Sequence, residues 1–205
     1  MSQVKLAVVY YSATGTNYKL AKAAEEGAVA AGAEVRVVRV QELAPEAAIA
    51  SNPAWKAHAD ETHGVVPVAT LDDLVWADAI IFSFATRFGA IPAQLKQFLD
   101  TTGGLWFQGK LVNKVVSAMS SAQNMHGGQE ASILSLYTTL YHWGAIVATP
   151  GYTDPIQFQA GGNPYGVSAT VDQQGNFDPI VLEAAKVQAR RVVTVASWVK
   201  QGMNG

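Results

Sequence analysis

The fold is decided by the run Val4-Lys5-Leu6-Ala7-Val8-Val9-Tyr10-Tyr11 together with Ser12-Ala13-Thr14-Gly15-Thr16-Asn17, which follows it directly. The first part is almost entirely apolar or β-branched, which is typical of a strand buried on both faces of a parallel sheet. The second part is a loop of hydroxyl groups around one glycine, and an alanine-rich stretch with helical spacing follows over 18–31. A buried strand, a tight polar loop and a helix form the opening unit of an open α/β sheet.

The rest of the chain repeats this alternation of apolar strands and periodic helices. We predict further strands over 34–40, 79–84, 114–120 and 145–149, and helices over 71–76, 92–102, 129–143 and 179–200. Gly103-Gly104 is expected to close the helix over 92–102. The prediction is an α/β fold in one domain over 1–205, a doubly wound five-stranded parallel sheet with helices on both faces.

Two segments, Pro45–Ala69 and Pro150–Asp178, are too long and turn-rich for a minimal version of this fold. We predict them to be long loop insertions that serve function or an interface. Within the first, His58 and His63 stand beside acidic residues but are five apart, which does not place them on one helical face. The sequence favours a solvated polar loop there and no metal site.

Composition excludes several classes of function. The 205 residues are 49% hydrophobic and 15% charged with a net charge of -2, so the surplus apolar groups are expected in a core, a pocket or a subunit interface. The sequence has no basic patch of the kind that a nucleic-acid or anionic-membrane partner would require. The absence of cysteine excludes disulfides and thiol chemistry, and no apolar stretch is long enough to span a bilayer. We expect a cytoplasmic protein.

The loop Ser12–Asn17, called loop 1, is predicted to bind a phosphate. It lies where a parallel strand meets a helix N-terminus, which presents free N–H groups and a positive dipole end. The sequence has no Gly-Lys-Ser/Thr ending and no Gly-x-Gly-x-x-Gly, so neither a nucleoside triphosphate nor a dinucleotide is indicated. A loop of hydroxyls, with the amide of Asn17 as a further donor, suits a terminal monophosphate such as that of FMN. Taken alone, an ordinary polar turn that caps a helix remains the alternative.

Two later loops follow strands in the same way. Loop 2 (85–92) contains Thr86 and Arg87 as polar groups for a planar ring and Phe88 as an aromatic neighbour, with Gly89 after it. Loop 3 (120–130) is rich in small residues that let backbone approach a ligand. Because the carboxyl ends of parallel strands share one edge, the three loops are expected to converge on one ligand.

The run Ser12-x-Thr14-Gly15-x-Asn17 resembles the phosphate loop of flavodoxins. Three further runs resemble the flavodoxin-like WrbA family of NAD(P)H:quinone oxidoreductases: Thr86-Arg87-Phe88-Gly89, Thr102-Gly103-Gly104-Leu105-Trp106 and Gly161-Gly162-Asn163-Pro164-Tyr165-Gly166. The resemblance covers essentially the whole chain, both insertions included. It implies a flavodoxin-like fold, bound FMN, NAD(P)H as electron donor, a quinone substrate and a homotetramer. Ala85, where relatives usually have proline, and a longer loop 3 with Met125 and His126 depart from the family pattern.

The resemblance also implies site residues. Those expected to contact FMN are Ser12, Ala13, Thr14, Gly15, Thr16, Asn17, Thr86, Arg87, Phe88, Gly89, Ser121, Ala122, Gln123, Asn124, His126, Gly127 and His142. His142 matches a histidine that reaches the cofactor from a neighbouring subunit and is the one candidate for a catalytic role. Trp106, Phe88 and Thr14 are expected to contact substrate or nicotinamide. The mechanistic hypothesis is a two-electron, ping-pong hydride transfer to quinone through one shared pocket. The alternatives are a flavodoxin-type electron carrier and an FMN-binding accessory protein without turnover.

Overall fold

A computed structural model describes residues 3–203. Its strands are β1 Lys5–Tyr11, β2 Glu34–Arg39, β3 Ala79–Ala85, β4 Val115–Ala122, β5 Ile146–Val147 and β6 Ser168–Thr170. Its helices are α1 Thr16–Ala30, α2 Glu46–Ala50, α3 Pro53–Thr62, α4 Leu71–Trp76, α5 Ala93–Asp100, α6 Gly103–Phe107, α7 Gln129–His142, α8 Ile156–Gln159 and α9 Ile180–Met203. The alternation predicted from the sequence is confirmed.

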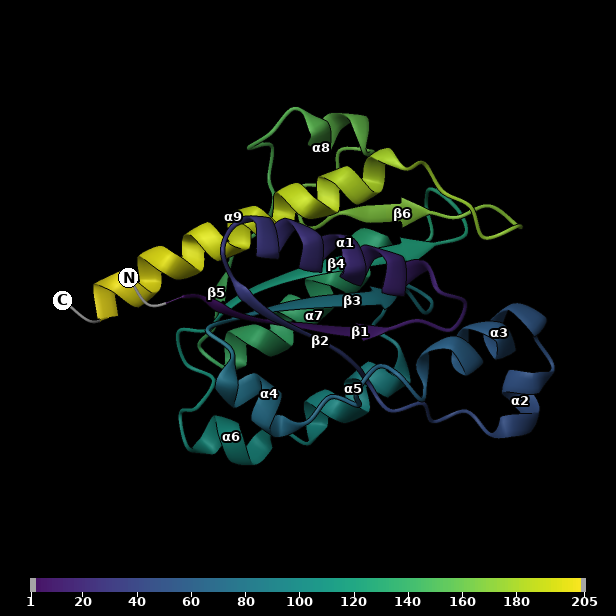
Figure 1. Cartoon of the computed structure of the whole chain (residues 1–205), viewed down its shortest axis with the longest axis horizontal. Coiled ribbons are helices and arrows are strands. Elements are labelled where there is room, and N and C mark those ends of the chain that lie inside the picture. The colour runs from purple at the N-terminus through teal and green to yellow at the C-terminus, as the bar shows by residue number, and fades with distance from the viewer. Residues whose placement is uncertain (1–2, 204–205) are drawn as a thin grey trace.

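The sheet is parallel with strand order β2-β1-β3-β4-β5. β1 is buried on both faces, as its sequence predicts: Leu6 and Val8 pack in one core, and Ala7 and Val9 in the other. Helices α1 and α9 cover the first face, and α4, α5 and α7 cover the second (Figure 1). This is the doubly wound architecture of a flavodoxin-like fold, with the carboxyl ends of β1, β3 and β4 along one edge.

The fifth place in the sheet is shared by two short strands. β5 pairs with Val115 and Val116 at the start of β4, and β6 pairs with 120–122 at its end. The predicted strand 145–149 is therefore shorter than expected, because the chain leaves the sheet and returns only at Ser168. β4 in turn continues to Ala122, two residues beyond its predicted end, because β6 supplies a hydrogen-bonding partner there.

Side chains from both helical layers close the gap between β5 and β6. The Tyr137 hydroxyl of α7 accepts a hydrogen bond from the N–H of Ala118 and donates one to the carbonyl of Tyr165, at 3.2 and 2.7 Å. From α9, the amide of Gln188 donates to the Ala118 carbonyl and accepts from the N–H of Val167, both at 2.8 Å. These buried bonds satisfy the side of β4 that faces away from β3, between its pairings with β5 and β6.

The first insertion is helical, contrary to the loop predicted for it. Asn52 caps α3 by accepting hydrogen bonds from the N–H groups of Ala54 and Trp55, and Pro53 occupies the first turn. Figure 1 shows α2 and α3 at the right of the view, beside the carboxyl edge of the sheet. A second difference concerns Gly103-Gly104, which begins α6 instead of leading into a loop.

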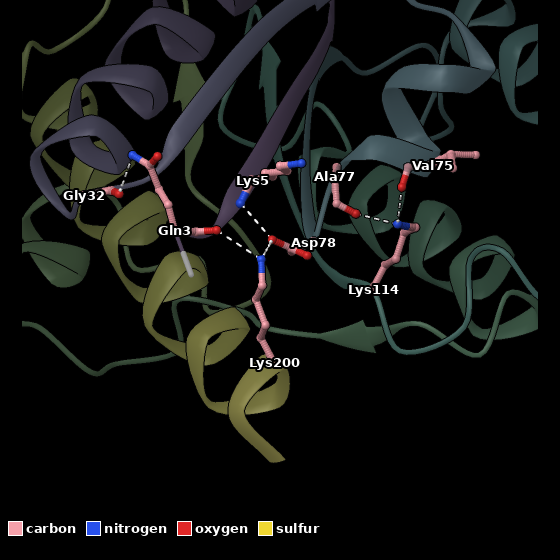
Figure 2. A network of polar contacts seen from close by, with 8 residues as sticks. All are labelled: Gln3, Lys5, Gly32, Val75, Ala77, Asp78, Lys114 and Lys200. Atoms are coloured by element: carbon pink, nitrogen blue, oxygen red, sulfur yellow. Dashed lines mark hydrogen bonds and ion pairs between the residues drawn. The ribbon is translucent and has the colours of Figure 1, made fainter. Parts of the chain in front are cut away.

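The opposite, amino edge of the sheet is tied together by polar contacts (Figure 2). The Lys200 ammonium of α9 lies 2.6 Å from a carboxylate oxygen of Asp78, which also accepts the N–H of Lys5 at 2.9 Å. The half-buried Lys114 donates to the carbonyls of Val75 and Ala77 at the end of α4, and burial lowers its pKa. Over residues 3–203, no helix has the length and apolar character needed to cross a membrane.

Candidate functional site

Loop 1 is shaped to receive an anion. The Ser12 hydroxyl oxygen accepts hydrogen bonds from the N–H groups of Gly15 and Asn17, at 3.0 and 3.2 Å, so its own proton points away from them. Gly15 stands at the start of α1 with a φ of 94°, and the first turn holds no acidic residue. Within residues 3–203 the N–H groups of Thr14 and Thr16 have no hydrogen-bond partner. Free donors at a positive helix end fit a phosphate group.

Asn17 has a different role from the one its sequence position indicated. We predicted its side-chain amide as a phosphate donor, but the residue is 1% exposed and the amide donates to the Ser121 hydroxyl at 2.8 Å. The Ser83 hydroxyl donates to the Asn17 carbonyl at 3.0 Å. Asn17 therefore joins loop 1 to the ends of β3 and β4 and fixes the position of the loop on the sheet.

Loop 2 is a tight two-residue turn. Arg87 and Ala90 exchange both backbone hydrogen bonds, at 2.9 and 3.0 Å. The residues between them, Phe88 and Gly89, have φ values of 52° and 76°. This conformation is ordinary for glycine and costly for phenylalanine. The Phe88 ring is 107% exposed, so the strained turn presents a fully solvated aromatic surface at the carboxyl edge.

Loops 2 and 3 meet backbone against backbone. A Cβ on Gly128 would lie 2.7 Å from the Cα of Gly89, which is closer than real side chains approach. The N–H of Thr86 donates to the Ser121 carbonyl at 2.9 Å, and the Thr86 and Ser132 hydroxyls are hydrogen-bonded. The predicted convergence of the loops after β1, β3 and β4 is therefore present in the fold.

Loop 3 is folded on itself and open to solvent at its tip. A Cβ on Gly127 would lie 2.3 Å from the Cβ of Ala122, and the Gln129 amide donates to the Asn124 carbonyl at 3.0 Å. Gln123, Asn124, Met125 and His126 are exposed. Met125 and His126 also line a cavity of about 550 Å³, which loop 3 shares with the segment 159–163, β6 and the start of α9. Sequence reasoning did not find this cavity.

An ionised carboxylate joins three elements at the same edge, which the sequence did not indicate. Glu42, after β2, accepts hydrogen bonds from the Tyr11 hydroxyl and the Gln94 amide, at 3.1 and 2.8 Å. Burial raises the pKa of Glu42, but these bonds and the N–H groups of Leu43 and Ala44 offset burial and leave the pKa below its usual value. Burial and the neighbouring Glu42 raise the pKa of Tyr11.

His58 lies against loop 1 and not in a solvated loop, so that prediction was wrong. It is 6% exposed within α3 because the insertion folds back onto α1, and burial lowers its pKa. His63 is exposed on the next turn of chain. In the described part of the chain no group of three or more His, Cys, Asp or Glu side chains could hold a metal ion.

Two predicted residues lie away from the loops of their own chain. His142 is the last residue of α7, whose 14 residues begin at loop 3 and extend about 21 Å toward the opposite edge. Trp106 lies in α6, at the lower left of Figure 1, and is 54% exposed. The turn 109–113 links the ends of α6 and α7 through hydrogen bonds. The N–H of Gly109 donates to the Trp106 carbonyl, and the N–H of Asn113 donates to the carbonyl of Gly144, just after α7. Trp106 and His142 therefore lie at the same end of the molecule.

Comparison with known proteins decides the family. The model of the NADPH-dependent FMN reductase family matches residues 4–154, most of the chain. The chain belongs to this family. A protein of Deinococcus radiodurans named NAD(P)H dehydrogenase (quinone) is 54% identical over 171 residues, which cover 83% of this chain and 85% of that protein. A protein of the same name from Rhizobium rhizogenes is 44% identical over 94% of this chain and 97% of its own.

Solved structures show the same fold. The flavodoxin, WrbA-like protein from Agrobacterium tumefaciens superposes with a TM-score of 0.65 at 20% identity, over 96% of this chain and 99% of that chain. Oxidised flavodoxin 2 from Bacillus cereus superposes with a TM-score of 0.59 at 16% identity, over 94% and 99%. At 20% identity or less these structures show the fold alone, and the flavodoxin-like fold expected from the sequence is confirmed.

Proposed function

We propose that this protein is an FMN-dependent NAD(P)H:quinone oxidoreductase that reduces quinones to quinols in a two-electron reaction. The observation that carries the proposal is the meeting of three loops at one edge of the sheet, with free N–H groups of loop 1 at the start of α1. The family and the shared name of the two relatives agree with it.

The residues present fit FMN. The Ser12 hydroxyl and the N–H groups of Thr14 and Thr16 would hold the phosphate, which the dipole of α1 also stabilises. Loop 2 and residues 121–127 of loop 3 would hold the flavin ring, with Arg87 as a positive charge near a ring that gains negative charge on reduction. When bound, FMN supplies the two-electron redox chemistry, and the protein positions the reactants around it.

Phe88 is the residue of this chain best placed to contact a flat substrate. Its ring is fully exposed and held outward by a turn that costs conformational energy. Stacking on such a ring contributes about 1 kcal/mol beyond burial. We propose that the nicotinamide and the quinone occupy this place in turn, with Thr14 beside the nicotinamide, which gives a ping-pong hydride mechanism.

The proposal includes a homotetramer in which a neighbouring subunit completes the site. Trp106 and His142 cannot reach the loops of their own chain, but both lie at one exposed end of the molecule. Phe107 and Tyr141, 84% and 62% exposed, give that end a large apolar surface, as expected of a subunit interface. There, Trp106 would line the substrate pocket and His142 would contact FMN. A cytoplasmic location, supported by a sequence without cysteine, is part of the proposal.

Initial rates with the FMN-loaded protein test the proposal. NADPH and benzoquinone are varied together, and double-reciprocal lines are expected to be parallel because one pocket serves both reactants in turn. Intersecting lines would contradict the shared pocket. Binding of FMN without any quinone reduction would favour an electron carrier or an accessory protein instead.

A further inference from the structure

The insertion 45–69 brings a buried aromatic ring against the glycine of loop 1. His58 is 6% exposed and lies in the middle of α3. A Cβ placed on Gly15 would lie 3.5 Å from Nδ1 of His58 and 3.9 Å from its Cγ. These are ordinary van der Waals separations, so the imidazole bounds the space that a side chain on Gly15 would occupy, at the residue where loop 1 becomes α1.

The ring is held in place by neighbours from separate elements. Its centroid lies 5.5 Å from that of Tyr18 in α1, and Tyr18 lies 5.4 Å from Tyr10 at the end of β1. The Thr62 hydroxyl donates to the His58 carbonyl at 2.7 Å within α3. Tilted aromatic pairs at this separation are stabilising, so α3, α1 and β1 form one packed unit below loop 1.

Gly15 needs such support because it has no side chain of its own to fix its conformation. Its φ of 94° lies in the left-handed region, which glycine adopts about as readily as conformations with negative φ. The Ser12 hydroxyl accepts the N–H of Gly15, and the His58 ring limits the space on the side where a Cβ would stand. The direction of the neighbouring N–H groups of Thr14 and Thr16 depends on this one residue.

The contact is one of packing and not of charge. Burial lowers the pKa of His58, and the neighbouring His63 lowers it further, while Glu61 opposes them. The imidazole is therefore neutral near pH 7, and a neutral ring of similar size is expected to replace it.

We propose that His58 is a positioning residue for the cofactor phosphate: its ring holds Gly15 in the left-handed conformation and so aligns the N–H groups of loop 1. The inference rests on the proposed function, because it requires FMN at this loop. It assigns to the first insertion a role in binding affinity, carried by a residue outside loops 1 to 3.

Comparing FMN with riboflavin, which lacks the phosphate, tests this role. Dissociation constants for both flavins are measured by fluorescence quenching with the full-length apoprotein. We expect His58→Ala to weaken FMN binding about tenfold, the effect of roughly one lost packing contact, and to leave riboflavin binding unchanged. His58→Phe keeps the ring and is expected to bind FMN like the wild type. His63→Ala is the matched control and should change neither constant.

Equal losses for FMN and riboflavin in His58→Ala would overturn the inference, as would unchanged FMN binding or a failure of phenylalanine to restore it. If His58→Ala does not fold, His58→Leu keeps most of the buried volume but not the flat ring and should still weaken FMN more than riboflavin; an equal effect on both would overturn the inference. A wild-type protein that binds neither flavin rejects the proposed function itself. If the wild type binds FMN and the His58 variants bind it equally well, only the role of His58 is rejected.

Discussion

Gly128→Ala is the substitution that most directly tests how loops 2 and 3 are joined. The glycine has a φ of +91°, and a Cβ there would lie 2.7 Å from the Cα and 3.2 Å from the N of Gly89. Left-handed backbone costs a residue with a Cβ about 1–2 kcal/mol. Forcing a methyl group against backbone that cannot rotate away adds about 1–3 kcal/mol. We expect a total loss of about 2–5 kcal/mol in the free energy of unfolding.

Gly32→Ala is the matched control. Gly32 also has a positive φ, +84°, but no atom lies within 4 Å of the Cβ that alanine would add. This variant is expected to lose only the conformational part, about 1–2 kcal/mol. Urea unfolding of both apoproteins gives the two free energies, and FMN titration gives the consequence for the site. Gly128→Ala should weaken FMN binding at least about tenfold, because it separates the loops, while Gly32→Ala should not. Equal destabilisation of the two variants would refute the close backbone contact.

Three further predictions follow from the same structure. Phe88→Asn replaces the phenylalanine with a residue that tolerates the strained φ of 52° and should stabilise the fold by about 1 kcal/mol. The melting temperature should rise by a few degrees, and KM for quinone should rise because the aromatic contact is lost. A lower melting temperature would contradict the strain. Tyr137→Phe removes the hydroxyl that serves Ala118 and Tyr165 and should cost about 1–3 kcal/mol in urea unfolding, whereas no loss would show that the gap between β5 and β6 closes without it. Burial lowers the pKa of His58 in the folded state, so the folded protein should lose stability as pH falls from the ordinary histidine value of 6.5 toward that lowered pKa. In His58→Phe, melting temperatures measured over the same pH range should decline less. An unchanged pH profile would contradict the buried histidine.

The central part of the fold could be predicted because its signals are local. A strand buried on both faces, a hydroxyl-rich loop and an alanine-rich helix stand next to one another in 4–31, and each is readable without its neighbours. The helix 71–76 was likewise found, and the structure adds a cap in which the N–H of Thr70 donates to the Asp73 carboxylate.

The insertions could not be predicted to the same extent. The segment around His58 is polar and lacks a clear apolar stripe, although Asn52 followed by Pro53 was an available signal for the start of a helix. The burial of His58 comes from packing against residues about 40 positions earlier, at Gly15 and Tyr18. The division of the fifth strand depends on Tyr137 and Gln188, whose hydrogen bonds to β4 are set by the tertiary fold and not by local pattern.

The arrangement of the three loops could be predicted because it follows from sheet topology, whereas the direction of individual side chains could not. Carboxyl ends of neighbouring parallel strands must meet, so loops 1, 2 and 3 were expected together. Whether the amide of Asn17 faces the ligand or the sheet interior depends on Ser83 and Ser121, which lie at least 66 residues away.

The central claim is that this site takes electrons from NAD(P)H and passes them to a quinone. The most direct measurement is the visible absorbance of the FMN-loaded protein, with NADPH and then benzoquinone added under anaerobic conditions. We expect a perturbed flavin spectrum that bleaches fully with one equivalent of NADPH and returns fully with one equivalent of quinone. A spectrum identical to that of free FMN, or a bound flavin that NADPH does not bleach, would contradict it.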